Sequence, residues 1–163
     1  DATLIELAAH ISSPGAQPQS FHTDHPWTAV RQVVTCFVAL HDIPSMLGPT
    51  EVFAGSHAEP AHVHAENGGP TLAGAKCPKD GSRCLFEAGL RGLTLRRGDV
   101  ALMDARVMHR GGGRPPGTPG ARTLLYLTLQ REGSFYGSEH TPSLLPEYIG
   151  RLPLAGWAGW VES

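Results

Sequence analysis

The sequence predicts an all-β domain, folded as an antiparallel barrel or a double-sheet jelly roll. Turn-forming residues are frequent, with 20 glycines and 14 prolines among 163 residues. They separate short stretches of β-branched and other apolar residues, and apolar residues make up 40% of the chain. No stretch of any length shows the apolar spacing of an amphipathic helix. Many short strands joined by turns are therefore expected.

The first half of the chain contains three extended segments. Residues 3–11 are expected to form a strand, which the turn-forming residues at 12–15 end. Residues 19–24 are short and extended, and Pro26 stops them. Residues 30–41 (VRQVVTCFVALH) are the strongest strand candidate because they are rich in β-branched residues and apolar on both faces. Such a strand is expected to be central and buried.

Four further strand candidates follow, at residues 50–53, 92–95, 100–104 and 121–130. A loop rich in glycine and proline, at 111–120, precedes the last of them. With the segments of the first half, these give seven or eight short strands, which is typical of a jelly roll.

The chain is expected to form one domain, residues 1–163, because its length is enough to bury a core. Residues 58–89 are polar and without pattern, which predicts a long loop insertion. Residues 143–163 are expected to form a C-terminal tail. The first residue is Asp1 and not methionine, so the N-terminal part of the domain is expected to be missing.

Charge and composition exclude several classes of function. The formal net charge is −2 and no basic patch stands out, which argues against nucleic acid as a partner. No segment approaches the ~18 apolar residues of a membrane span. Three cysteines are too few for a disulfide scaffold, so we expect a reducing intracellular compartment such as the cytoplasm. The sequence carries no signal for an oligomeric state.

A histidine and an aspartate two positions apart, His22 and Asp24, are candidate metal ligands. On an extended segment, side chains i and i+2 point to the same side, so both can meet one ion. His109 is the best third ligand, because it follows an apolar strand and precedes glycines that allow a close approach to the backbone. Two histidines and a carboxylate form the facial triad that leaves positions open on Fe(II).

The tripeptide alone is weak evidence, but four blocks of sequence around it occur in order. They are SPGA at 13–16 with QSFHTD at 19–24, VAL at 38–40 with GPT at 48–50, GSH at 55–57, and GDVALMD at 98–104 with HRGG at 109–112 and Arg122. In this combination the chain resembles the phytanoyl-CoA dioxygenase family of Fe(II)- and 2-oxoglutarate-dependent oxygenases.

The resemblance implies a double-stranded β-helix, the cupin-like form of the jelly roll. It also implies an enzyme that uses Fe(II), 2-oxoglutarate and O₂ to hydroxylate a C–H bond of a small organic or lipid-like substrate, with release of succinate and CO₂. His22, Asp24 and His109 match the metal ligands of the family. No catalytic side chain beyond these ligands is expected, since the metal and co-substrate carry the chemistry.

The resemblance also assigns residues to the co-substrate. Arg122 matches the arginine that clamps the distal carboxylate of 2-oxoglutarate, a role that suits the planar guanidinium fork. Gln19 and Thr50 match positions that commonly form hydrogen bonds with the co-substrate. The chain departs from the family at Gly111, where many members carry a small hydroxyl residue, and the upstream region that holds substrate-pocket groups in the family is expected to be missing.

Two residues are candidates for substrate binding. Trp27 is expected at the mouth of the site, with a buried core aromatic as the alternative. Arg106 is expected either to reach the pocket or to pair with Asp104. Asp24 argues against a halogenase, because the related halogenases lack this carboxylate. Two rival functions remain: a cupin-like domain that binds metal or ligand without turnover, and a zinc hydrolase.

Overall fold

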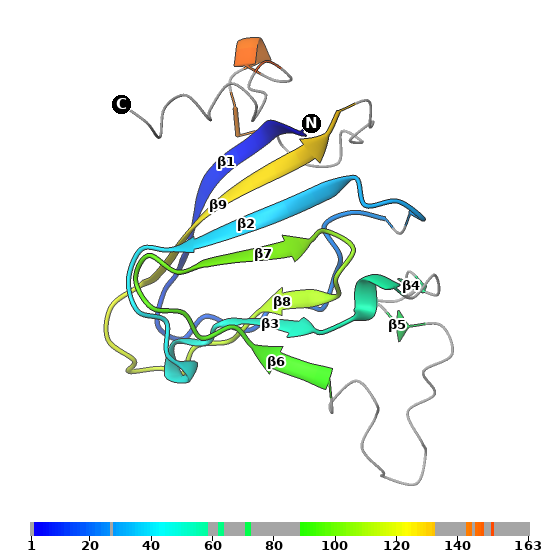
Figure 1. The fold of residues 1–163 in the computed structure, drawn as a ribbon. Coiled ribbons are helices and arrows are strands. Elements are labelled where there is room, and N and C mark those ends of the chain that lie inside the picture. Colours follow the sequence, from blue (N-terminus) through cyan, green and yellow to red (C-terminus); the bar gives the residue numbers. More distant parts are fainter. Residues whose placement is uncertain are drawn as a thin grey trace, which may run out of the picture.

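The computed structural model describes residues 2–26, 28–58, 62–63, 71–72, 89–132, 143–144, 146–148 and 151 (Figure 1). Most of the assigned elements are strands, with three short 3-10 turns at Ser45–Leu47, Ser56–Ala58 and Pro146–Tyr148. The strands are β1 (Ala2–Ser12), β2 (Val33–Ala39), β3 (Thr50–Phe53), β4 (His62–Val63), β5 (Thr71–Leu72), β6 (Leu90–Gly92), β7 (Val100–Asp104), β8 (His109–Gly111) and β9 (Arg122–Arg131).

The strands form two main antiparallel sheets. One has four strands in the order β1-β9-β2-β7, and the other has three in the order β6-β3-β8. Figure 1 shows the smaller sheet beyond the β7 edge of the larger one. Strands far apart in sequence are neighbours in both sheets, as in a jelly roll. The short strands β4 and β5 pair only with each other.

The register of the larger sheet decides which side chains share a face. Glu6 of β1 lies opposite Thr128 of β9, which lies opposite Thr35 of β2. Two residues along, Tyr126 of β9 lies opposite Phe37 of β2. Because alternate residues of a strand point to the same side, these residues form one face of the sheet, and that face carries hydroxyl and carboxyl groups.

The apolar core joins the two sheets. Val52 of β3 packs with Met103 of β7 and with Val107, which follows β7. A second cluster contains Ala39, Ile43 and Leu124. Phe37 packs against both clusters. This ring therefore connects the two parts of the core, and it lies on the same face of the larger sheet as Thr35.

Two predicted strands match the structure in both bounds, two match within one residue, and the others differ. The strands predicted at 3–11 and 121–130 are the observed β1 and β9, whereas the extended segment at 19–24 forms only an isolated bridge, at His22. Residues 50–53 and 100–104 are the observed β3 and β7. The strand predicted at 92–95 lies instead at Leu90–Gly92, since Leu95 forms only an isolated bridge with Ile43. The segment predicted at 30–41 is a strand only at Val33–Ala39.

Strand β8 was not expected, because the segment at residues 109–111 is short and runs into three consecutive glycines. Its pairing with β3 comes from chain folding and not from local sequence preference. Of the predicted loop at 58–89 and the tail at 143–163, the described residues are too few to test either prediction. Within the described part of the chain, no helix has the length and apolar character needed to cross a membrane.

Candidate metal centre

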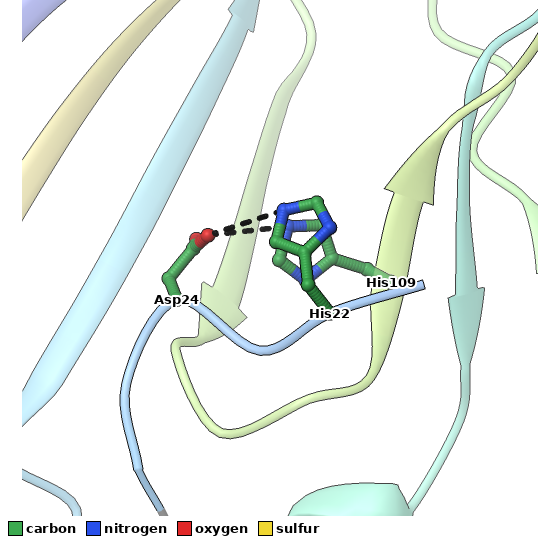
Figure 2. Close-up of side chains that lie close together, drawn as sticks. All are labelled: His22, Asp24 and His109. Carbon is green, nitrogen blue, oxygen red and sulfur yellow. Dashed lines mark ion pairs between the residues drawn. The ribbon is translucent and has the colours of Figure 1, made fainter. Parts of the chain in front are cut away.

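His22 and His109 face each other across a two-residue antiparallel bridge. The backbone N–H of each residue donates to the carbonyl oxygen of the other, at 2.9 Å in both directions. The bridge ties the segment before Asp24 to strand β8 (Figure 2). The two imidazole rings lie 4.4 Å apart between centroids. The backbone itself therefore brings these two side chains together.

Each imidazole is oriented by a hydrogen bond from its Nδ1 atom to a backbone carbonyl oxygen. The Nδ1 atom of His22 lies 2.9 Å from the carbonyl oxygen of Ser20, and the Nδ1 atom of His109 lies 2.9 Å from that of Val107. A carbonyl oxygen can only accept, so each Nδ1 must carry the proton. Each Nε2 then presents its lone pair, which is how metal-bound histidines are usually fixed.

Asp24 completes the group. Its Oδ1 atom lies 3.6 Å from Nε2 of His22 and 3.5 Å from Nε2 of His109, as Figure 2 shows. One ligand atom from each residue lies within 4.8 Å of the other two. Ligands at right angles, each ~2.1 Å from an ion, would lie ~3 Å apart, and the two distances from the Asp24 oxygen to the imidazoles are close to this spacing. The Thr35 hydroxyl donates to the other oxygen, Oδ2, at 3.4 Å.

Burial differs among the three ligands. The His109 side chain is 6% exposed, whereas those of Asp24 and His22 are 21% and 40% exposed. Burial lowers the pKa of His109, and this effect outweighs the attraction of Asp24, which raises it. The neutral imidazole that binds metals is thereby favoured. The accessible side of the centre is the side of His22.

The ligands line a cavity of about 250 Å³. Its other polar lining residues come from the larger sheet, from β3 and from the segment before His22, and they are Glu6, His10, Gln19, Thr35, Thr50, Tyr126 and Thr128. A concave site with a few convergent polar groups beside three possible ligands is the usual form of a small-molecule site.

Arg122 begins β9 and is almost completely buried, at 1% exposure. Its Nη2 donates to the hydroxyl of Ser12 at 2.8 Å, whereas its buried Nε has no hydrogen-bond partner. Burial, together with the nearby charge of Arg114, lowers the pKa of Arg122. Among the ion pairs of the described residues, none offsets the charge of Arg122. A buried charge without a counter-ion is costly, and a bound anion would supply one.

Gln19 and Gly111 form the wall between the cavity and Arg122. The Gly111 N–H donates to Oε1 of Gln19 at 2.7 Å, which leaves the amide N–H₂ of Gln19 as a free donor for an anion. A Cβ atom at Gly111 would lie 2.7 Å from this Oε1 and 3.5 Å from Nη2 of Arg122. The glycine that departs from the family pattern therefore makes room for the Gln19 side chain.

The predicted substrate residues do not join this group. Arg106 does not line the cavity; its guanidinium pairs with Asp104 at 2.8 Å and donates to the carbonyl oxygen of Thr28. The alternative of an ion pair with Asp104 is therefore the observed one, and substrate binding by Arg106 gains no support. Trp27 lies outside the described residues.

Sequence reasoning missed all the lining residues of the larger sheet, namely Glu6, Ala9, His10, Thr35, Phe37, Tyr126 and Thr128. Glu6 is the one acidic residue within a predicted apolar strand, and Tyr126 and Thr128 alternate in the last strand. That spacing could have placed them on one face, but only the strand pairing shows that the face is the inner one.

Comparison with known proteins places this chain in a family. The family model described as phytanoyl-CoA dioxygenase (PhyH) matches residues 2–116, well over half of the chain. The chain belongs to the phytanoyl-CoA dioxygenase family. The family match confirms the predicted resemblance. A search of the curated proteins finds no match.

Solved structures show the same fold as this family member. The crystal structure of EvdMO1 has a TM-score of 0.60 at 19% identity, over 82% of this chain and 28% of EvdMO1. AviO1 from Streptomyces viridochromogenes has a TM-score of 0.59 at 18% identity, over 83% and 53% of the two chains.

The epimerase SnoN, crystallised with Fe3+, alpha ketoglutarate and nogalamycin RO, has a TM-score of 0.58 at 18% identity, over 88% of this chain and 62% of SnoN. These similarities confirm the cupin-like, double-stranded β-helix fold that the sequence predicts. The chain spans between about a quarter and three fifths of the length of the three solved proteins.

Proposed function

We propose that this protein is an Fe(II)- and 2-oxoglutarate-dependent dioxygenase that hydroxylates a C–H bond of a small organic substrate. The observation that carries the proposal is the convergence of Nε2 of His22, Nε2 of His109 and Oδ1 of Asp24 within 4.8 Å of one another. Two imidazoles and one carboxylate are the ligand set of non-haem Fe(II) oxygenases. Membership of the phytanoyl-CoA dioxygenase family supports the same reaction class.

The buried charge of Arg122 supports 2-oxoglutarate as the co-substrate. Its unpartnered Nε and its position behind Gln19 and Gly111 fit a distal carboxylate that enters from the cavity. A guanidinium recognises a carboxylate through two parallel hydrogen bonds. The Gln19 side chain must turn aside for the carboxylate to reach Arg122, and its amide N–H₂ then donates to the same anion. Thr50, which lines the cavity, supplies a hydroxyl beside it.

In the proposed reaction, the residues around the candidate ligands position the metal-binding atoms. When bound, Fe(II) with 2-oxoglutarate and O₂ supplies the oxidation of a substrate C–H bond, with succinate and CO₂ as co-products. Ser20 and Val107 hold the imidazole protons away from the metal position through their carbonyl oxygens. Thr35 fixes the Asp24 carboxylate so that only Oδ1 faces the imidazoles.

The first experiment is an anaerobic titration. We expect the protein with Fe(II) and 2-oxoglutarate to give the weak visible charge-transfer band of a chelated 2-oxoacid, and to release succinate when O₂ is admitted. Asp24→Ala should lose the band because it removes one of three ligands. Asp42→Ala, which removes an exposed carboxylate far from the triad in sequence, should retain it.

Two outcomes would count against the proposal. If the wild-type protein gives no band under these conditions, the assignment of metal and co-substrate fails. If it gives the band but no succinate with O₂ and any substrate mixture tested, the protein is a binding domain of the same fold and not an oxygenase.

A further inference from the structure

Glu6, Tyr126 and Thr128 form a group in the cavity that the metal site does not use. We name it the Glu6 cluster. The Tyr126 hydroxyl donates to Oε1 of Glu6 at 3.1 Å, and the Thr128 hydroxyl donates to Oε2 at 2.9 Å. All three residues line the same cavity as the candidate ligands. The cluster therefore presents an oriented carboxylate to whatever occupies the cavity beside the metal.

The register of the sheet places the Glu6 cluster on the Asp24 side of the cavity. Thr128 lies opposite Thr35, and the Thr35 hydroxyl donates to Asp24. Arg122 lies six positions before Thr128 on the same strand, which corresponds to ~20 Å along an extended chain. The arginine that would hold the co-substrate thus begins β9, whereas the Glu6 cluster lies midway along β1 and β9, beside the Thr35 that contacts Asp24.

The two donors keep Glu6 in its role as an acceptor. Burial and the nearby Glu6 raise the pKa of Tyr126 to about 12, so the phenol remains protonated and donates. An ionised carboxylate has about four acceptor positions, and the hydroxyls of the cluster use two of them. Within the described part of the chain, Glu6 forms no ion pair, and the remaining acceptor positions are available to a ligand.

The cations of the site lie away from the Glu6 carboxylate. Arg122 and the nearby Arg114 are at the start of β9 and the segment before it, and no described cation forms an ion pair with Glu6. At the Glu6 end of the cavity, the acidic groups Glu6 and Asp24 therefore face the bound ligand without a lysine or arginine among the lining residues. A partly buried carboxylate of this kind is stabilised by a cation that donates hydrogen bonds to it.

We propose that the Glu6 cluster binds a cationic amine group of the substrate and so directs a neighbouring C–H bond toward the metal. This inference rests on the proposed function. The cavity, at about 250 Å³, is smaller than typical drug-sized pockets. This volume is enough for the amine-bearing end of a substrate beside the metal position.

The test uses three probes of equal length: n-butylamine, n-butanol and n-butyrate. Each is titrated anaerobically into the protein loaded with Fe(II) and 2-oxoglutarate, and binding is followed by the change in the charge-transfer band. One charge-assisted hydrogen bond corresponds to roughly a tenfold to hundredfold gain in affinity. We expect butylamine to bind at least roughly tenfold more tightly than either other probe.

Two variants separate recognition from structure. Glu6→Gln keeps the shape of the side chain and its acceptor oxygen, and it should remove the preference for butylamine without changing the Fe(II) and 2-oxoglutarate affinities. Glu51→Gln is the matched control, because Glu51 is a partly buried glutamate that pairs with Arg110 at 2.5 Å and does not line the cavity. The Glu51→Gln variant should keep the preference.

The results distinguish this inference from the proposed function on which it rests. If the loaded wild-type protein gives the band and binds butanol or butyrate as tightly as butylamine, the amine site is overturned and the oxygenase stands. A preference for butylamine that persists in Glu6→Gln also overturns it. If no band forms on loading, both proposals fail.

Discussion

The buried charge of Arg122 has no compensating acidic group in the described part of the protein. This residue is 1% exposed, has an unpartnered Nε and has no acidic partner among the described residues. Replacing a buried charge by an apolar side chain of similar volume is often neutral or stabilising. The same charge is needed for a bound carboxylate. Stability and co-substrate affinity are therefore expected to respond in opposite directions when it is removed.

This conflict gives a prediction for Arg122→Met. Without 2-oxoglutarate, the variant should unfold at the same temperature as the wild type or at a higher one, because the desolvated guanidinium is gone. Its affinity for 2-oxoglutarate should fall by about a hundredfold, as expected for the loss of a bidentate charged hydrogen bond. Thermal unfolding and calorimetric titration with 2-oxoglutarate and Mn(II) measure the two effects. An unchanged affinity would show that another residue holds the co-substrate.

The connection between β7 and β8 carries His109 and is fixed by the pair of Asp104 and Arg106. Asp104 closes strand β7, and both of its carboxylate oxygens accept hydrogen bonds from the Arg106 side chain, at 2.9 and 2.8 Å. The two side chains are 13% and 11% exposed. Arg106 also donates to the backbone of Thr28. The pair therefore joins this connection to the segment that follows Asp24.

Asp104→Asn is predicted to destabilise the protein in a pH-dependent way. Burial raises the pKa of Asp104, but the hydrogen bonds and charge of Arg106 lower it more, so the net pKa is below its ordinary value of 3.8. The carboxylate thus stabilises the fold above that value, and the contribution is lost as pH falls through the lowered pKa. Loss of one partner of a buried pair costs about 3 kcal/mol.

Urea unfolding at a series of pH values checks this prediction. The difference in free energy of unfolding between wild type and Asp104→Asn should be largest near neutral pH and should shrink below about pH 4. A difference that stays constant down to pH 2 would mean that the charge of Asp104 contributes nothing and that only its shape matters.

Among the strands, those that were predicted correctly are the ones whose residues carry a local strand pattern. Strands β3 and β7 end at turn residues on both sides, and their bounds were predicted correctly. Strand β8 has three residues, two of them without strong strand preference, and it exists because β3 and the His22 segment pair with it. No local pattern encodes such a partner, so this strand could not be predicted from its own residues.

The same distinction holds for the site. The three candidate ligands could be predicted because the chemistry of the triad and its spacing are visible in sequence motifs, and the structure brings their ligand atoms together. The Glu6 cluster could not be predicted, because a glutamate in a strand is usually solvent-facing until the pairing of β1 with β9 shows which face is inside. The free donor of Gln19 likewise depends on Gly111, which lies far away in sequence.

In the molecule as a whole, the two sheets converge on the candidate metal centre. The β8 edge of the smaller sheet carries His109, the bridged segment carries His22 and Asp24, and the larger sheet supplies the cavity wall with Thr35. Both imidazoles are oriented by hydrogen bonds to backbone carbonyl oxygens, and Asp24 accepts one from the Thr35 hydroxyl. The site is therefore expected to bind metal with little rearrangement.

The most direct test is a crystal structure grown anaerobically with 2-oxoglutarate and Mn(II), a redox-stable substitute for Fe(II), with anomalous scattering recorded to locate the metal. The account predicts one anomalous peak ~2.1 Å from Nε2 of His22, Nε2 of His109 and Oδ1 of Asp24, with a 2-oxoglutarate carboxylate on Arg122. A peak at any other group of side chains, or ordered protein with no peak at these three atoms, would contradict it.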